Sequence, residues 1–120
     1  MASTMRVRNL SRDADLADRA SVADNFFRRL RGLLGRAGLE AGEGLVIRPC
    51  TSVHMLGMRF PLDILYLDRS GTVLRAVPEL QPGTFGPMVW RSHMAVELPA
   101  GTIAATGTIS GDQVALEPVA

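Results

Sequence analysis

The sequence contains no lysine, so all 13 of its basic residues are arginine. A Schiff base, a pyridoxal phosphate anchor, a phosphate loop of the Walker A type and a Ser-x-x-Lys nucleophile all require a lysine amine. The absence of lysine therefore excludes each of these classes of site.

Cysteine is nearly as scarce, because Cys50 is the only one in the chain. A single cysteine excludes an internal disulfide and any multi-cysteine zinc or iron-sulfur site within one chain. The two histidines, His54 and His93, form no His-x-x-x-His or His-Glu-x-x-His spacing, and no Cys-x-x-Cys occurs. We therefore expect no metal site and no cofactor.

Long apolar runs are also missing. The richest stretch, Val53–Leu67, is interrupted by Arg59 and Asp63, whereas roughly 20 apolar residues are needed to span a bilayer. Residues 1–10 contain two arginines but lack the apolar core of a signal peptide. We therefore expect a soluble, cytoplasmic protein without a transmembrane segment.

Aromatic residues are few, at 5% of the chain, and the pI is about 8.0. Residues 1–36 hold eight arginines against four aspartates, whereas the remainder holds five arginines against eight acidic residues. Arg28, Arg29 and Arg31 lie in this basic first part. The modest pI and low aromatic content disfavour nucleic acid, so we interpret these arginines as a solvated face, with binding to nucleic acid or an acidic surface as the alternative.

What the chain does contain is typical of a globular domain. It has 120 residues, of which 47% are hydrophobic and 21% charged. This composition is too apolar for disorder, and the length falls within the usual size of one domain. We therefore expect residues 1–120 to form a single domain with a core over about residues 5–117.

One helix is predicted near the start, at about residues 21–35. Ser21-Val22-Ala23-Asp24 resembles a capping box, in which the serine oxygen accepts a first-turn amide and the acid favours the positive helix end. An apolar stripe then recurs every four residues, at Val22, Phe26, Leu30 and Leu34. Glycines indicate a loop over residues 36–44.

The rest of the sequence consists mainly of short β-prone runs. A turn at residues 68–71 predicts a β-hairpin, and residues 78–90, rich in Pro and Gly, predict a long surface loop of the kind that often covers a site. A helix followed by many strands predicts an α+β fold, with predominantly antiparallel short strands in a barrel-like or half-open sheet and the helix packed against it. Strands are expected at residues 5–10, 14–20, 45–48, 52–56, 62–67, 72–77, 94–98 and 113–117, whereas residues 102–105 are too short to classify.

The stretch from Pro49 to Asp63 brings together the most chemistry. Cys50 and His54 lie four residues apart, so an extended backbone places both on one face. In a functional interpretation, His54 turns the Cys50 thiol into a thiolate nucleophile, Asp63 orients the imidazole and Arg59 holds an anion.

A structural interpretation of the same residues is favoured. Lone cysteines are commonly buried, so Cys50 is expected to be a small buried hydrophobe and His54 a hydrogen-bonded core residue. Arg59 and Asp63 are expected to form an ion pair that closes one end of the barrel.

An ordered series of short motifs resembles the prokaryotic family known as domain of unknown function 192. The resemblance extends from about Met5 to Leu116 and implies a compact α+β fold with a barrel-like sheet, but it implies no reaction. The motifs are Gly32-Leu33-Leu34-Gly35-Arg36, Gly42-Glu43-Gly44-Leu45-Val46-Ile47, Pro49-Cys50 to His54, Met58 to Asp68, Glu97-Leu98-Pro99-Ala100-Gly101 and Gly111-Asp112.

The preferred hypothesis for function is a binding or accessory module for a small molecule or peptide, not an enzyme. Its ligand-binding residues are expected to be Cys50, His54, Arg59 and Asp63. The first alternative is a small enzyme with Cys50 and His54 as catalytic residues, acting on an acyl or similar electrophilic substrate. The second is a nucleic-acid or acidic-surface binder that uses the arginine-rich helix. The sequence specifies no oligomeric state.

Overall fold

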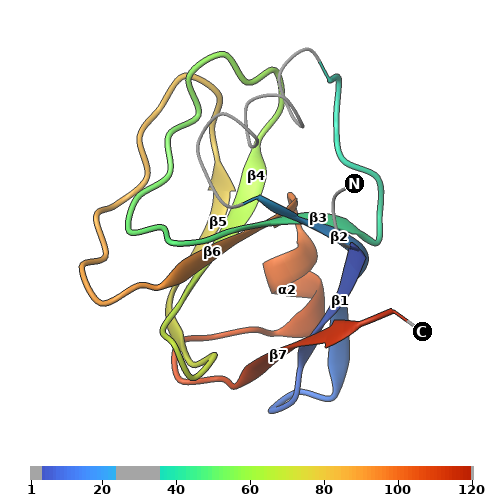
Figure 1. The fold of residues 1–120 in the computed structure, drawn as a ribbon. Coiled ribbons are helices and arrows are strands. Elements are labelled where there is room, and N and C mark those ends of the chain that lie inside the picture. Colours follow the sequence, from blue (N-terminus) through green and yellow to red (C-terminus); the bar gives the residue numbers. More distant parts are fainter. Residues whose placement is uncertain (1–3, 24–35, 120) are drawn as a thin grey trace.

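The described residues form one curled, mixed sheet of seven strands and one short helix (Figure 1). The computed structural model of the chain describes residues 4–23 and 36–119. The strand order is β5-β4-β6-β3-β2-β1-β7, so β5 and β7 form the two edges. The elements are β1 (Thr4–Asn9), β2 (Ala14–Ala23), β3 (Glu43–Ile47), β4 (Leu62–Leu67), β5 (Val73–Leu80), β6 (Met94–Pro99), α2 (Thr102–Thr106) and β7 (Val114–Pro118).

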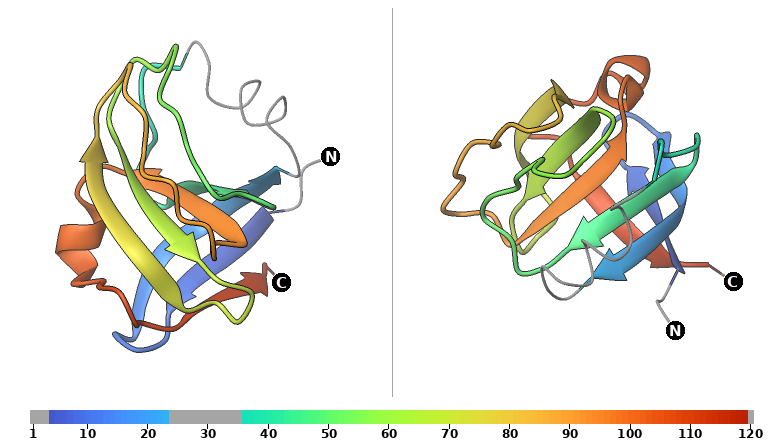
Figure 2. Two further views of the ribbon diagram at one scale, coloured as in Figure 1. Left: turned by 90° about the vertical axis from the view of Figure 1, so that its left-hand side faces the viewer. Right: turned by 90° about the horizontal axis from the view of Figure 1, so that it is seen from above.

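The sheet curls into a half-barrel, as the two further views show (Figure 2). This confirms the barrel-like or half-open sheet expected from the sequence. Neighbouring strands are antiparallel with one exception, the parallel pair β2 and β3, in which Ser21 lies opposite Leu45. The expectation of mainly antiparallel pairing is therefore correct except at this pair. No helix in the described residues has the length and apolar character needed to cross a membrane.

The predicted start of a helix at Ser21 is wrong. Ser21, Val22 and Ala23 form the end of β2 and pair with Leu45, Val46 and Ile47 of β3. The strand ladder binds their backbone groups, and this non-local pairing outweighs the local capping pattern. Residues 24–35, which carry the rest of the predicted helix and its arginines, lie outside the described residues.

Seven of the eight expected strands are found, and so is the hairpin of β4 and β5. The strand predicted at residues 52–56 is wrong, because that segment makes only an isolated bridge between His54 and Phe85. The loop predicted at residues 78–90 starts too early, because β5 continues through Pro78 to Leu80. A proline is tolerated there because β5 is an edge strand.

The central strands are buried on both faces. In β4, Leu65 and Leu67 pack in one apolar cluster, whereas Leu62, Ile64 and Tyr66 pack in a second cluster on the other face. Alternation along a strand explains this division. Both faces of the sheet must therefore be covered by other parts of the chain. Among its residues, the helix α2 contributes Ile103 to the first cluster.

The second cluster, called the outer cluster below, is covered by two long connections, residues 48–61 and residues 81–93. They lie together above the sheet in both figures, and backbone hydrogen bonds join them. Val53 and Met55 from the first connection are buried in the cluster, with exposed fractions of 3% and 0%. The candidate site residues therefore lie on a segment that is itself part of the packed structure.

A buried polar network ties the hairpin of β1 and β2 to the loop before β7. The Asn9 amide donates to Asp112 and to Thr108 at 3.0 Å each, and the Arg12 guanidinium donates to Asp112 at 3.0 Å. The amide of Ile109 also donates to Asp112, at 3.0 Å. These hydrogen bonds, led by those from Arg12 and Asn9, lower the pKa of Asp112 to about 2.

This network predicts a loss of stability in acid. A carboxyl whose pKa is depressed by folding stabilises the native state above its ordinary pKa, and that stabilisation disappears as the pH falls through the folded value. For Asp112 the loss is expected between about pH 4 and pH 2. In thermal denaturation, the difference in Tm between wild type and Asp112→Asn should shrink steadily across this window. A difference that stays constant would contradict the assignment.

Candidate functional site

The segment from Cys50 to Met55 is fixed in place by the connection that follows β5. The amide of Cys50 donates to the carbonyl of His93 at 3.0 Å. In the other direction, the amide of Val89 donates to Thr51 at 2.8 Å and the amide of Gly86 donates to Val53 at 2.7 Å. These contacts pair two loops almost as strands pair, so the segment forms a wall with a defined orientation.

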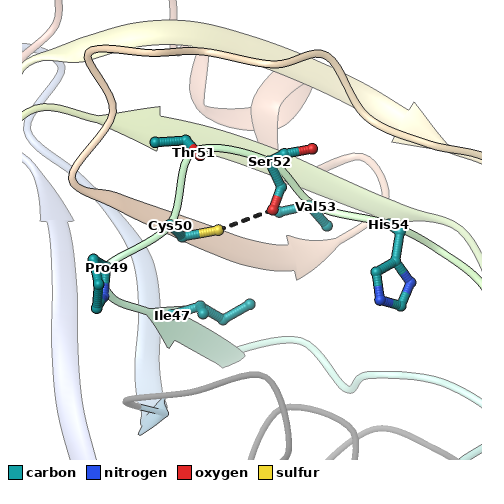
Figure 3. Close-up of a pocket in the computed structure, with 7 residues that line it drawn as sticks. All are labelled: Ile47, Pro49, Cys50, Thr51, Ser52, Val53 and His54. Atoms are coloured by element: carbon teal, nitrogen blue, oxygen red, sulfur yellow. Dashed lines mark hydrogen bonds between the residues drawn. The ribbon is translucent and has the colours of Figure 1, made fainter.

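This wall encloses a pocket of about 260 Å³ (Figure 3). It presents one thiol, two hydroxyls and one imidazole beside three apolar side chains, and no charged residue among the described ones lines it. The lining residues are Ile47, Pro49, Cys50, Thr51, Ser52, Val53 and His54. A small pocket with apolar walls and a few polar groups is typical of a ligand site.

Cys50 is half-buried in this pocket. Its thiol points towards the residues that follow it, and Sγ donates to the carbonyl oxygen of Ser52 at 3.2 Å (Figure 3). A carbonyl oxygen accepts a hydrogen bond from a thiol, so this contact fixes the orientation of Sγ. The sulfur is not sealed in the core, which differs from the structural interpretation of the sequence.

His54 lies at the other end of the same lining segment (Figure 3). Its Nδ1 accepts a hydrogen bond from the amide of Leu56 at 3.3 Å, and its ring faces that of Phe85 with centroids 6.5 Å apart. A neutral imidazole whose Nδ1 is an acceptor carries its hydrogen on Nε2. Neither nitrogen of that tautomer is then ready to take a proton from the thiol, because Nδ1 is occupied and Nε2 is protonated.

Asp63 belongs to the scaffold of the fold. It is fully buried, and its Oδ1 accepts the amide of Glu79 at 2.8 Å while Oδ2 accepts the amide of Ile103 at 2.7 Å. Because Leu62 and Ile64 face the outer cluster, alternation directs Asp63 to the opposite face, towards α2. One side chain thus ties β5 and the start of α2 to β4.

The predicted ion pair between Arg59 and Asp63 is wrong. No such pair is found between these two described residues, and Arg59 is exposed on the outer connection. The structure therefore brings Cys50 and His54 to one pocket, but neither Arg59 nor Asp63 lines it. Alternation along β4 directs Asp63 to the face of the sheet opposite the connection that carries Arg59.

Tyr66 was missed by sequence reasoning, although it supports the floor of this region. It is fully buried, and its hydroxyl donates to the carbonyl of Pro87 at 3.1 Å. Burial above all raises the pKa of Tyr66 to about 12. The phenol therefore stays protonated and acts as a fixed donor beneath the loop.

Gly86 was missed as well. A Cβ atom built at this position would lie 2.7 Å from the Tyr66 hydroxyl and 3.0 Å from the carbonyl oxygen of Val53, which lines the pocket. Only glycine allows the loop to approach so closely. The dipeptide Gly86-Pro87 is the one signal in the sequence that marks this constraint. Among the described residues, no group of three or more His, Cys, Asp or Glu side chains is arranged to hold a metal ion.

Two solved structures share this fold. One is a protein of unknown function from Novosphingobium aromaticivorans DSM 12444, with a TM-score of 0.78 and 23% identity, covering 93% of this chain and 83% of the other. The second, from Sinorhizobium meliloti 1021, is described as a candidate transcription regulator. It has a TM-score of 0.76 and 22% identity, and the match covers 97% of this chain and 94% of that one. At these identities the similarity concerns the fold alone.

The sequence comparisons identify the family. A UPF0127 protein from Thermococcus sibiricus (strain DSM 12597 / MM 739) is 27% identical over 100 residues, which are 80% of this chain. The match spans 64% of the length of that relative. The family model for DUF192, described as "Uncharacterized ACR, COG1430", matches residues 7–116. The chain therefore belongs to the DUF192 family.

Proposed function

We propose that the chain is a binding module whose ligand enters the pocket between Ile47 and His54. The observation that supports this proposal is the pocket itself, in which a thiol, two hydroxyls and an imidazole surround apolar walls. Its volume of about 260 Å³ lies just below the range of roughly 300–1,000 Å³ typical of pockets for drug-sized ligands. The ligand is therefore a small molecule or one side chain of a bound peptide.

The lining also indicates the chemistry of the ligand. The described residues that line the pocket include no arginine, aspartate or glutamate, so these residues provide no opposite charge for an ion. The hydroxyls of Thr51 and Ser52 can both donate and accept hydrogen bonds, and Ile47 and Val53 offer apolar contact. A neutral ligand with a small apolar body and one hydrogen-bonding group matches this lining.

The contacts of Cys50 and His54 support binding over covalent catalysis. The thiol donates to the carbonyl of Ser52, and Nδ1 of His54 accepts the amide of Leu56. A nucleophilic cysteine needs a base within hydrogen-bonding distance that can accept its proton. The alternative enzyme would have to break both contacts before the pair could react.

A fragment screen by two-dimensional NMR tests this proposal, with a matched block at the thiol. Neutral fragments are expected to shift the amide signals of residues 47–54. Converting Cys50 to its methyl disulfide with methyl methanethiosulfonate should abolish those shifts, because the adduct fills a small pocket. Arg59→Ala is the control, since this exposed side chain does not line the pocket, and fragment binding should be unchanged.

Two results would count against the proposal. Fragment shifts that persist after the thiol is blocked would place the ligand elsewhere. Alkylation of Cys50 by iodoacetamide at a rate far above that of an unstructured thiol peptide would favour the enzyme, because only a thiolate reacts so fast.

A further inference from the structure

We propose that a second surface, centred on Trp90, Arg69 and Arg91, binds an acidic, extended segment of a partner protein. This surface, the Trp90 strip, consists of two adjoining hollows that share Arg69 and Ser70. It is separate from the pocket of the proposed function, and Pro49 is the only described residue that lines both. The inference therefore goes beyond that function and does not depend on it.

Trp90 is the most exposed large apolar side chain among the described residues, with an exposed fraction of 80%. It lies in a tight turn in which the amide of Ser92 donates to the carbonyl of Val89 at 3.0 Å. The next residue is also fixed, because the amide of His93 donates to Leu67 at 2.8 Å. The indole is thus presented to solvent from a rigid turn. Tryptophan and arginine are the residues that dominate binding energy at protein interfaces.

The charge around Trp90 is positive. Arg69 and Arg91 line the same hollow of about 540 Å³, and the described part of the chain offers neither of them an ion pair. Among the described residues the one acid in the hollow is Asp68, whose Oδ1 already accepts the amides of Ser70 at 2.9 Å and Thr72 at 3.0 Å. Two guanidinium groups are therefore available to a carboxylate, which they can bind through paired hydrogen bonds.

The strip continues past Arg69 into the second hollow. This one has a volume of about 310 Å³ and is lined by Leu10 and Arg48 as well as the shared residues. Arg48 is also exposed and has no ion pair among the described residues. Arginines in two adjoining hollows, each of which also contains an apolar side chain, fit an extended chain better than one compact molecule.

The chemistry of the strip favours a peptide over a single nucleic acid strand. Non-specific binding of single strands uses several aromatic side chains on which successive bases stack. Among the described residues, the strip offers the indole of Trp90 and the imidazole of His93 but no phenylalanine or tyrosine, which falls short of a row of stacking rings. An acidic peptide would place carboxylates on the arginines and one apolar side chain on the indole.

Binding of a short capped peptide of alternating glutamate and leucine tests the inference. Trp90 is the only tryptophan in the chain, so its emission reports on the strip directly. We expect the emission to shift to shorter wavelength on binding at low salt, and the affinity to fall as salt rises. A matched peptide with glutamine in place of glutamate should bind at least tenfold more weakly.

Variants are compared by the fluorescence anisotropy of a labelled copy of the peptide. Arg69→Gln and Arg91→Gln should each weaken binding about threefold, and Trp90→Ala about tenfold or more. Arg75→Gln is the matched control, because this exposed arginine on β5 lines neither hollow, and its affinity should equal that of wild type. An equal loss in this control, tighter binding of oligothymidylate than of the peptide, or no binding at low salt would overturn the inference.

Discussion

Replacing Asp63 by asparagine is expected to lower the free energy of unfolding by about 3 kcal/mol. The two carboxylate oxygens of Asp63 accept the amides of Glu79 and Ile103, and the residue has an exposed fraction of 0%. An asparagine has one acceptor oxygen and one NH₂ group, so one backbone amide would face another donor at a fully buried position. A loss of this size is a large part of the total stability of an ordinary domain.

Urea denaturation followed by circular dichroism measures the change in the free energy of unfolding. In thermal denaturation, the Tm of the same variant should be lower by roughly 10 °C. The control is Asp13→Asn, because the Asp13 side chain is 92% exposed and pairs with Arg8 only at the surface. Asparagine also tolerates the positive φ of 51° at this position. The control should change the free energy of unfolding by less than about 0.5 kcal/mol. Equal stability of the two variants would mean that Asp63 does not hold β5 and α2.

The importance of Asp63 explains why the recognisable motifs of the sequence indicate a fold better than an activity. Asp63 lies within one of these motifs, and Asp112, which ends another, organises the network of Asn9, Arg12 and Ile109. Gly42 has a φ of 88°, and a Cβ there would lie 2.6 Å from Oδ1 of Asp18. The two aspartates accept backbone amides, and Gly42 allows a backbone conformation that other residues rarely adopt. These motif residues therefore stabilise the fold.

The strands were predictable because their pattern is local. In β4, six consecutive buried residues read as a β-prone run bounded by a proline and a turn, and its predicted limits match the structure. The parallel pairing of β2 with β3 was not predictable, since nothing in Ser21-Val22-Ala23 specifies which distant strand binds its amides. The same non-local pairing explains why the helix start predicted at Ser21 is wrong.

The candidate site was predicted in part. The even spacing of Cys50 and His54 correctly placed both residues at one pocket, although their segment is not a strand of the sheet. Proximity in sequence does not bring Arg59 and Asp63 together, because alternation along β4 directs the Asp63 side chain to the other face of the sheet, where it binds α2. Trp90 was not singled out, since its exposure depends on how a long loop folds back over β4.

Gly86→Ala is expected to lower the free energy of unfolding by about 2 kcal/mol. The added methyl group would lie 2.7 Å from the hydroxyl of Tyr66 and 3.0 Å from the carbonyl oxygen of Val53. Both partners belong to packed structure, because Tyr66 is fully buried and Val53 has an exposed fraction of only 3%. The loop must therefore move away from the segment that lines the pocket, and fragment binding should weaken along with stability.

A double-mutant cycle with Tyr66→Phe identifies the clash. Removing the hydroxyl alone should cost about 1 kcal/mol, because the carbonyl of Pro87 loses its donor. In the double variant the methyl group gains the space of the missing hydroxyl, so the combined loss should be smaller than the sum by about 1 kcal/mol. Gly38→Ala is the control, since nothing lies within 4 Å of a Cβ there, and its stability should equal or slightly exceed that of wild type. Strict additivity in the cycle would show that the hydroxyl and the loop do not meet, and the close approach of Gly86 would then have to be explained by Val53 alone.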